Sequence, residues 1–283
     1  MKIITTIEQL TVHITAIKKA NKSIGLVPTM GYLHEGHMAL ATAAREENDI
    51  VIMSLFVNPA QFGPNEDYER YPRDLERDAK IAEKVGVDFL FAPTVEEMYP
   101  TNGGIQIIAG PQSKILCGAT RPGHFDGVLK IVTKLFHLTL PTQAYFGQKD
   151  AQQLAIIETL VRDYNFPLAI RSVPIVREED GLAKSSRNVF LTEQQRLQAP
   201  VIQQALDLAK RHYLKNGDIL WATKLATEHI EYNATGKMDY LQMLSYPDLT
   251  EVTEQTDKVL LAAAVYFGKT RLIDNIIFQR KGE

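Results

Sequence analysis

The stretch IGLVPTMGYLHEGHMAL, residues 24–40, decides the fold, because it predicts a buried strand, a turn and the start of a helix. Its opening run, IGLVP, is apolar throughout, as strands buried on both faces tend to be. Gly31 and Gly36 lie where the strand pattern ends, close to a pair of histidines, His34 and His37. A metal site, a phosphate site and simple packing are three alternatives for this pair.

Working outward from this stretch, short apolar runs alternate with helical patterns through the first 176 residues. Strands are predicted at 24–28, 49–57, 87–93, 105–110, 144–147 and 168–176. Helices are predicted at 73–86, 125–140 and 149–166. This alternation predicts an α/β fold, with a Rossmann-like, doubly wound parallel sheet that carries helices on both faces.

The pattern changes after about residue 176, where helices come first and strands follow. Two helical stretches, 191–217 and 218–233, precede the strand-like runs 238–245, 258–268 and 270–278. Pro200 is expected to end or kink the first helix. We therefore expect a Rossmann-like domain over residues 1–177 and a smaller C-terminal α+β domain over residues 178–283.

The composition is that of a globular protein and argues against several classes. A net charge of -3 gives no basic field that would attract nucleic acid. The single cysteine, Cys117, excludes an internal disulfide and a cysteine-rich metal site. No signal peptide is evident, and the longest apolar run, 259–267, is too short to span a bilayer. We expect a cytoplasmic protein without nucleic-acid or membrane partners.

Nucleotide binding is the favoured interpretation of the histidine pair. A zinc site needs further ligands, and in the signature H-E-x-x-H the second histidine comes one residue later than His37 does here. In an open α/β sheet, ligands bind beyond the carboxyl ends of the strands, where a helix N-terminus offers N–H groups to phosphate. Gly31 and Gly36 would let the backbone approach a ligand, and imidazoles could donate to phosphate oxygens.

Two further stretches carry cations that suit phosphate. In GLAKSSRN, residues 181–188, two cations and two hydroxyls fall within four residues, although a polar interdomain loop is the plain alternative. In FGQKD, residues 146–150, Lys149 is expected in the first turn of a helix. A lysine there is electrostatically disfavoured unless an anion neutralises both it and the helix dipole, which again points to phosphate.

Two loops suggest a site for a smaller molecule. FVNPAQFGPNEDYERYPRD, residues 56–74, combines neutral polar groups with apolar neighbours, which suits a small polar ligand with an apolar body as well as it suits an ordinary loop. LCGATRPGHFDG, residues 116–127, is rich in glycine. Whether its Arg121 and His124 are structural or functional stays open.

Together these stretches resemble the pantothenate synthetase (pantoate–β-alanine ligase) family. PTMGYLHEGH is similar to the HIGH signature of the nucleotidyltransferase superfamily, and GLAKSSRN is similar to its KMSKS signature. The matching stretches are PTMGYLHEGH, FVNPAQFGPNEDYERYPR, LCGATRPGHFDGV, YFGQKDAQQL and REEDGLAKSSRNVFL, which follow one another in the family's order between residues 28 and 191.

The resemblance implies an AMP-forming ligase that condenses (R)-pantoate with β-alanine, using ATP and Mg²⁺. Pantoate would attack the α-phosphate of ATP, giving a pantoyl adenylate and pyrophosphate, and the β-alanine amine would then displace AMP. The domain of residues 1–177 would bind ATP and pantoate, and residues 178–283 would form a lid. The resemblance also implies a homodimer, and it leaves the ligands of Mg²⁺ unknown.

The family's site residues carry over position by position. His37 is the residue usually assigned as proton donor, and His34 and Lys149 would act with it on the phosphates. Gln61 and Gln153 would hold pantoate, with Asn58 and Tyr71 as further neighbours of that site. ATP would contact Met30, Gly31, Tyr32, Leu33, His34, Glu35, Gly36, His37, Gly147, Gln148, Lys149, Asp150, Val176, Lys184, Ser185, Ser186 and Arg187.

One departure and two other functions stay open at this stage. Lys184 stands where the family commonly has Met or Leu, so either its side chain or only its backbone would bind phosphate. A different nucleotidyltransferase would act on a phosphorylated acceptor, which the neutral loop at Asn58 and Gln61 disfavours. A catalytically silent nucleotide-binding module is the third possibility, and the intact histidines and Lys149 argue against it.

Overall fold

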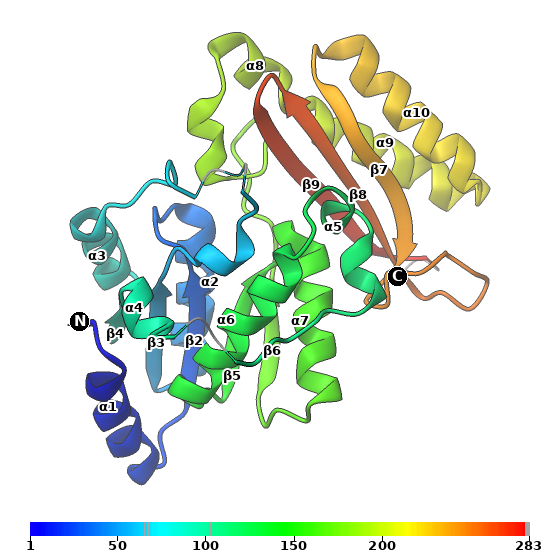
Figure 1. Cartoon of the computed structure of the whole chain (residues 1–283). Coiled ribbons are helices and arrows are strands. Elements are labelled where there is room, and N and C mark those ends of the chain that lie inside the picture. Colours follow the sequence, from blue (N-terminus) through cyan, green and yellow to red (C-terminus); the bar gives the residue numbers. More distant parts are fainter. Residues whose placement is uncertain (65, 67, 102–103, 281–283) are drawn as a thin grey trace. The chain divides into compact units, whose positions relative to one another are not determined.

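The computed structural model describes residues 1–64, 66, 68–101 and 104–280 (Figure 1). It consists of two compact units. Unit 1 comprises Met1–Ser113, Gly118–Gly147 and Ile156–Val173, and unit 2 comprises Lys114–Cys117, Gln148–Ala155 and Pro174–Glu283. The domain limits at 177 and 178 stay a prediction. Within the described ranges, no helix is long and apolar enough to cross a membrane.

Unit 1 is built on a six-stranded parallel sheet with the strand order β1–β4–β3–β2–β5–β6. The chain fills the sheet on one side of β2 first and then crosses to β5 on its other side, so the predicted doubly wound arrangement is confirmed. The strands are β1 (Lys2–Ile4), β2 (Ile24–Thr29), β3 (Ile50–Leu55), β4 (Phe89–Phe91), β5 (Gln143–Gly147) and β6 (Ala169–Val173).

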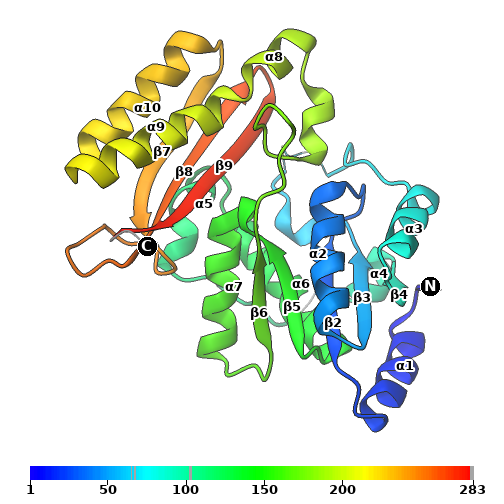
Figure 2. The ribbon, with the colours of Figure 1, turned by 180° about the vertical axis from the view of Figure 1, so that it is seen from behind.

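Helices cover both faces of this sheet. Figures 1 and 2 show α6 (His124–Thr139) on one face and α2 (Glu35–Glu47) on the other. Helix α1 (Ile7–Lys19) packs on α6, and α3 (Leu75–Lys84) packs on α2. In the helix predicted at 125–140, the apolar residues recur at helical spacing, and α6 buries this stripe, which consists of Val128, Ile131, Val132, Leu135 and Phe136. Shorter helical segments are α4 (Val95–Met98) and η1 (Pro59–Gln61). Three elements contribute residues to both units, namely η2 (Pro111–Lys114), α5 (Cys117–Thr120) and α7 (Ala151–Asp163).

Unit 2 contains a three-stranded antiparallel sheet of order β7–β8–β9, formed by Lys237–Ser245, Lys258–Phe267 and Thr270–Gln279. Its helices are α8 (Glu193–Gln198), α9 (Val201–Asn216) and α10 (Ile219–Asn233), and its short turns are η3 (Gln148–Asp150) and η4 (Ser186–Phe190). Pro200 separates α8 from α9, as predicted from its missing N–H group. The smaller α+β part is therefore confirmed.

One predicted strand is wrong. Residues 105–110 form no strand, and the side chains of Ile105 and Ile108 are 82% and 76% exposed. The backbone N–H of Ala109 donates to the Asp126 carboxylate (2.8 Å) and to no neighbouring strand. An apolar run becomes a strand only when another strand supplies its hydrogen-bond partners, and here a side chain replaces that partner.

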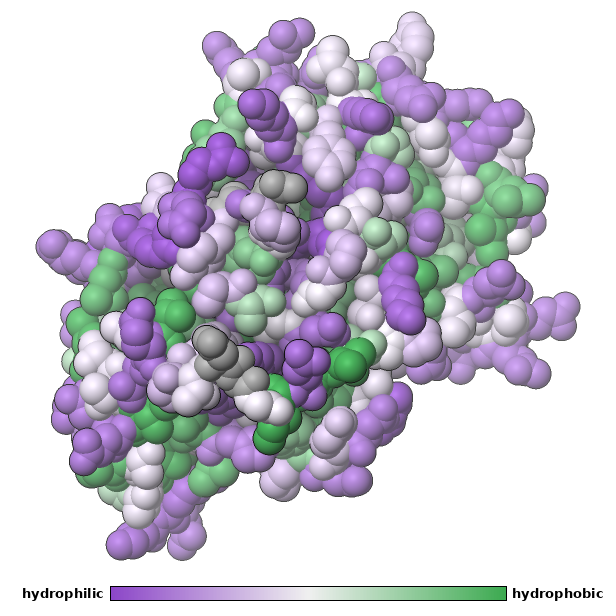
Figure 3. All heavy atoms as spheres, in the orientation of Figure 1, coloured by the Kyte–Doolittle hydropathy of each residue, from purple (hydrophilic) through white to green (hydrophobic). Residues whose placement is uncertain are grey.

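One face of the molecule is mostly hydrophilic. On the face shown in Figure 3, hydrophilic side chains predominate, and the apolar ones lie among them in small groups. Scattered exposed apolar side chains are normal for globular proteins and need no partner to explain them.

A glycine allows η1 to pack on α6. A Cβ atom built on Gly127 would lie 2.1 Å from the carbonyl oxygen of Ala60 and 2.6 Å from the Cα atom of Gln61. Because both neighbours are backbone atoms, neither can rotate away. The loop that carries Gln61 can therefore lie against α6 only if position 127 has no side chain.

We predict that Gly127→Ala destabilises the protein, which a urea denaturation curve would measure. The overpacking cost of about 1–3 kcal/mol exceeds the roughly 1 kcal/mol that alanine gains over glycine inside a helix. Gly110→Ala is the matched control, because a Cβ atom there meets nothing within 4 Å. A Gly127→Ala protein as stable as the control would contradict the packing argument.

Candidate active site

The turn after β2 has an unusual backbone. Gly31 and Tyr32 both have positive φ, at 88° and 51°. Glycine adopts this conformation freely, whereas tyrosine adopts it only against steric resistance. Thr29, at the end of β2, donates through its hydroxyl to the carbonyl of Ser54 (2.6 Å) and accepts from the N–H of Gly31 (3.2 Å). The turn is thus tied to β3 before it reverses.

A buried carboxylate holds the next part of the turn. Asp78 on α3 is 2% exposed, and it accepts from the backbone N–H groups of Tyr32 (2.6 Å) and Leu33 (2.8 Å). Arg77 pairs with Asp78 (3.0 Å), donates to the carbonyl of Leu33 (2.8 Å) and lies over the Tyr32 ring, 4.7 Å from its centroid. These contacts stabilise the left-handed conformation of Tyr32. The sequence predicted a helix over residues 73–86 but gave Asp78 no role.

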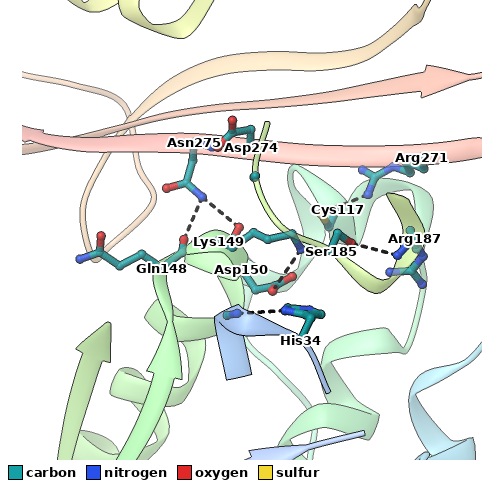
Figure 4. Close-up of polar contacts among 12 residues, drawn as sticks. His34, Cys117, Gln148, Lys149, Asp150, Ser185, Arg187, Arg271, Asp274 and Asn275 are labelled. Atoms are coloured by element: carbon teal, nitrogen blue, oxygen red, sulfur yellow. Dashed lines mark hydrogen bonds and ion pairs between the residues drawn. The ribbon is translucent and has the colours of Figure 1, made fainter. Parts of the chain in front are cut away.

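The two histidines cap α2 in a reciprocal arrangement. The Nδ1 atom of His34 (Figure 4) accepts from the N–H of Gly36 (3.1 Å). The Nδ1 atom of His37 accepts from the N–H of His34 (3.3 Å). Their ring centroids are 4.0 Å apart. Because both Nδ1 atoms accept, each neutral ring carries its proton on Nε2. Two Nε2–H donors therefore sit at the N-terminus of a helix, where anions are favoured.

Gly36 leaves room for this arrangement. A Cβ atom at this position would lie 2.8 Å from Cε1 and 3.0 Å from Nδ1 of His34. Any side chain at position 36 would therefore push the His34 ring away from its cap.

A cluster of neutral amides lies beside this turn in unit 1. Asn58 is 1% exposed, and its Nδ2 donates to Oε1 of Gln61 (3.1 Å) and to the carbonyl of Gly127 (3.0 Å). Tyr99 donates to Oδ1 of Asn58 (2.9 Å), and burial raises the pKa of Tyr99 to about 12, so this donor stays protonated at neutral pH. Nε2 of Gln61 donates to the sulfur of Met30 (3.1 Å). The predicted residues Gln61, Asn58 and Met30 are thus in contact.

Arg121 and His124 act on the backbone of this loop. Arg121 forms a two-point ion pair with Glu66 (2.7 and 2.5 Å) and donates to Nε2 of His124 (3.1 Å). Because Nε2 accepts, the proton of a neutral His124 is on Nδ1, which donates to the carbonyl of Gln61 (2.8 Å). The geometry thus gives both residues a structural role, a question that the sequence left open.

Unit 2 holds the predicted cationic residues. Lys149 lies in η3, directly before α7, and its ammonium group is 3.6 Å from the carboxylate of Asp150 (Figure 4). Gln153 is half-buried on α7. The neighbouring Gln152 has a structural role, because its amide accepts from the N–H of Cys117 (2.9 Å) and donates to the carbonyl of Ile115 (2.7 Å).

The segment 176–187 folds back on itself. An antiparallel bridge pairs Arg177 with Ala183, and the N–H of Lys184 donates to the carbonyl of Val176 (2.9 Å). The ammonium group of Lys184 is 3.0 Å from the carboxylate of Glu178. A phosphate would therefore compete with Glu178 for this side chain, and the backbone N–H of Lys184 is already engaged.

The rest of this segment caps η4. The hydroxyl of Ser185 accepts from the backbone N–H of Arg187 (3.2 Å), which fixes the start of η4 (Figure 4). Ser186 and Arg187 therefore occupy the first positions of this short helix.

The described residues do not form an all-protein metal site. Within the parts of the chain that the structure describes, no group of three or more His, Cys, Asp or Glu side chains could hold a metal ion. The His34 and His37 pair is thus not part of such a cluster. Magnesium commonly keeps several waters and binds through substrate phosphates and one or two carboxylates, so it does not require such a cluster.

Comparison with known proteins decides the family. The profile described as Pantoate-beta-alanine ligase matches residues 2–277. The chain belongs to the pantoate–β-alanine ligase family. It is 67% identical to the pantothenate synthetase of Lysinibacillus sphaericus over 281 residues, which is 99% of each chain, and 52% identical to that of Bacillus cereus (strain ZK / E33L) over 280 residues, which is 98% of each.

Solved structures agree with this assignment. The crystal structure of pantothenate synthetase from Thermus thermophilus aligns with a TM-score of 0.91 at 43% identity, covering 99% of this chain and 100% of that one. A pantoate–β-alanine ligase from Francisella tularensis, complexed with β-γ ATP and β-alanine, aligns with a TM-score of 0.79 at 35% identity, covering 99% and 98%. The sequence-based prediction of the ligase family, its fold and its reaction is confirmed.

We predict that Asp78→Ala loosens the turn of this ligase. It leaves the N–H groups of Tyr32 and Leu33 without their carboxylate partner, at a cost of about 1–3 kcal/mol for each buried group. Hydrogen–deuterium exchange of the peptide containing residues 30–34 should speed up.

Asp74→Ala is the control on the same helix. Asp74 caps α3 by accepting from the N–H of Arg77 (3.0 Å), and losing this cap costs about 1 kcal/mol. The control should leave exchange at residues 30–34 unchanged. Equal exchange in the two variants would mean that Asp78 does not hold the turn.

Proposed function

We propose that the residues described above make this chain condense (R)-pantoate with β-alanine through a pantoyl adenylate, using ATP. The observation that carries the residue-level proposal is the capped histidine pair, which presents Nε2–H donors at the start of α2 in a chain of this ligase family. The ATP and β-alanine complexed with the Francisella relative support the same substrates here.

In the first step, an oxygen of the pantoate carboxylate attacks the α-phosphorus of ATP. The bond between that phosphorus and the oxygen bridging to the β-phosphate breaks, and pyrophosphate leaves. Two anions must approach each other, so the reaction needs hydrogen-bond donors and cations more than a nucleophilic side chain. We assign this work to the Nε2–H groups of His34 and His37 and to the ammonium group of Lys149. As proton donor, His37 would act in its protonated form and give the proton to an oxygen of the leaving pyrophosphate.

The nucleotide contacts follow the segments around these residues. Met30–His37 would contact ATP through the turn and the α2 N-terminus, and Gly147–Asp150 through η3. Val176 would contact the nucleotide by its backbone. Lys184–Arg187 would reach the phosphates, with Lys184 leaving Glu178 when ATP binds.

Gln61 and Gln153 would bind pantoate, and Gln61 would also lie near β-alanine. The donor of Gln61 is bound to the sulfur of Met30, which is a weak acceptor. A substrate oxygen can therefore take this donor at small cost. In the second step, the β-alanine amine attacks the carbonyl carbon of the adenylate, the carbon–oxygen bond to AMP breaks, and the amide of pantothenate forms.

Three further properties belong to the same proposal. Mg²⁺ would arrive bound to the phosphates of ATP and neutralise part of their charge, and no residue of this chain is assigned as its ligand. A homodimer and a cytoplasmic location are proposed from the resemblance to the family and from a composition with a single cysteine.

We predict that the purified protein exchanges labelled pyrophosphate into ATP only when pantoate and Mg²⁺ are both present. Adenylation is reversible and precedes the amide step, so β-alanine should not be required. Chelation by EDTA should stop the exchange, and added Mg²⁺ should restore it. Exchange without any acid, or none with pure pantoate, would rule out the proposed reaction.

We further predict that His37→Ala and Lys149→Ala each lower pantoate-dependent exchange by about 10²-fold or more, as loss of a positioned transition-state donor does. Circular dichroism should show that both variants stay folded.

His137→Ala and Lys80→Ala are the controls, because both side chains are exposed and neither is assigned to the site. Lys80 pairs with Glu76 on its own helix. His137 donates to the carbonyl of Thr133 on its helix and packs against the ring of Phe166, with ring centroids 5.4 Å apart. Near-normal exchange in the two site variants would contradict the assigned roles.

A further inference from the structure

Two polar residues interrupt the apolar strand β9. Asp274 and Asn275 are each 4% exposed, and they pair in register with Ala263 and Ala262 of β8. Buried polar side chains cost free energy unless they form hydrogen bonds, so their partners show what they do. Successive strand residues point to opposite faces, and a dipeptide can therefore contact two different segments.

Asn275 binds the backbone on both sides of Lys149. Its Nδ2 donates to the carbonyl of Gln148 (2.8 Å) and to the carbonyl of Lys149 (2.9 Å) (Figure 4). Each carbonyl belongs to a rigid peptide plane, and these are the two planes that flank the Lys149 Cα atom. With both planes held, the φ and ψ angles of Lys149 are set, and so is the direction in which its side chain leaves the backbone.

Asp274 binds the segment that carries Lys184. Its two carboxylate oxygens accept from the two terminal nitrogens of Arg177 (2.6 and 2.9 Å). Arg177 also donates to the carbonyl of Gly181 (2.9 Å), and its backbone pairs with Ala183. The carboxylate therefore fixes the base of the fold-back between Val176 and Lys184.

These contacts are poorly explained as a source of stability. Burial raises the pKa of Asp274, and the hydrogen bonds and charge of Arg177 oppose that rise. The attraction within a buried ion pair does little more than offset the free-energy cost of removing both charges from water. Apolar side chains of similar size often stabilise a protein as well or better. Such a pair is more useful for fixing a unique arrangement of the segments that it joins.

We propose that Asp274 and Asn275 are positioning residues for adenylation, which set the direction of Lys149 and the conformation of residues 176–184. This inference rests on the proposed function, in which both segments contact ATP. The two residues do not themselves touch substrate. They act through Lys149 and through Arg177.

A double-mutant cycle tests the role of Asn275. Single-turnover formation of pantoyl adenylate would be measured for the wild type, Asn275→Ala, Lys149→Ala and the double variant. Asn275→Ala should slow the step by about 10–100-fold in the wild type, since small misplacements of a catalytic group have effects of this size. In the Lys149→Ala background the same change should cost less than about 3-fold, because the group it positions is gone.

Phe278→Leu is the matched control on the same strand. Phe278 is buried and packs against Tyr213, with ring centroids 6.1 Å apart, so its truncation destabilises unit 2 without touching either segment. It should lower the denaturation midpoint but leave the rate unchanged. Asn275→Ser, whose hydroxyl can donate to one carbonyl at most, replaces Asn275→Ala if the alanine variant does not fold.

Arg177→Lys tests the role of Asp274. It keeps the charge beside Asp274 but loses the two-point contact and the bond to Gly181, so adenylation should fall about 10-fold, again as expected for a small misplacement. Arg211→Lys is its control, because Arg211 is exposed on α9 in the same unit and lies outside residues 176–184 and outside β9. The control should leave adenylation unchanged.

Three results would overturn the inference. The first is an equal loss from Asn275→Ala in both Lys149 backgrounds, and the second is a rate loss in Phe278→Leu as large as that in Asn275→Ala. The third is an Arg177→Lys protein as active as Arg211→Lys. A wild-type protein without pantoate-dependent exchange would instead refute the proposed function. The exchange assay on the wild type therefore comes first, and it separates this outcome from the three results above.

Discussion

The carboxylate of Asp78 is the constraint on which the unit 1 site depends. Its two oxygens accept from consecutive backbone N–H groups, those of Tyr32 and Leu33, while Tyr32 holds a left-handed conformation. That conformation costs free energy for any residue with a side chain, so the turn needs an external anchor. Once the turn is fixed, the chain enters α2 with His34 at the cap. The histidine geometry is therefore set by a residue on a different helix.

The caps of α2 also settle the chemistry that the histidines can perform. Serine or aspartate commonly caps a helix through a side-chain oxygen, but here imidazole nitrogens accept the N–H groups. This use of Nδ1 leaves Nε2 as the donor on both rings. Capping of α2 and binding of an anionic substrate therefore use different nitrogen atoms of the same two rings.

The sequence could predict features that depend on local pattern. The strand and helix around residues 24–40, the apolar stripe of α6 and the break at Pro200 all follow from periodicity or from proline. It could not predict Asp78, since a carboxylate on a charged helix looks solvated until its partners are known. The strand predicted at 105–110 was wrong for a related reason. A strand requires a neighbouring strand as hydrogen-bond partner, and the spacing of apolar residues does not show whether one is present.

Long-range hydrogen bonds explain the remaining gaps in the site. Asp274 and Asn275 carry a weak signal, two adjacent polar residues inside an apolar strand, but their partners lie about 97 to 127 positions away in the chain. The pairing of Lys184 with Glu178 was equally hidden, although the two residues are only six apart. A sequence motif identifies a residue by its chemical type. The hydrogen bonds and ion pairs of that residue depend on how the loop folds, which the motif does not show.

The residues assigned to pantoate in unit 1 and those assigned to ATP differ in charge, and this difference has a chemical reason. The predicted pantoate residue Gln61 of unit 1 is bonded to the neutral amide of Asn58, and Arg121, which lies near the carbonyl of Gln61, is paired with Glu66. The cations assigned to ATP, Lys149, Lys184 and Arg187, belong to unit 2. A carboxylate held by neutral donors keeps more of its nucleophilicity than one bound in an ion pair. Cations kept for the phosphates instead stabilise the charge that develops as pyrophosphate leaves. A cation moved into the amide loop would bind the acid more tightly and make it a poorer nucleophile.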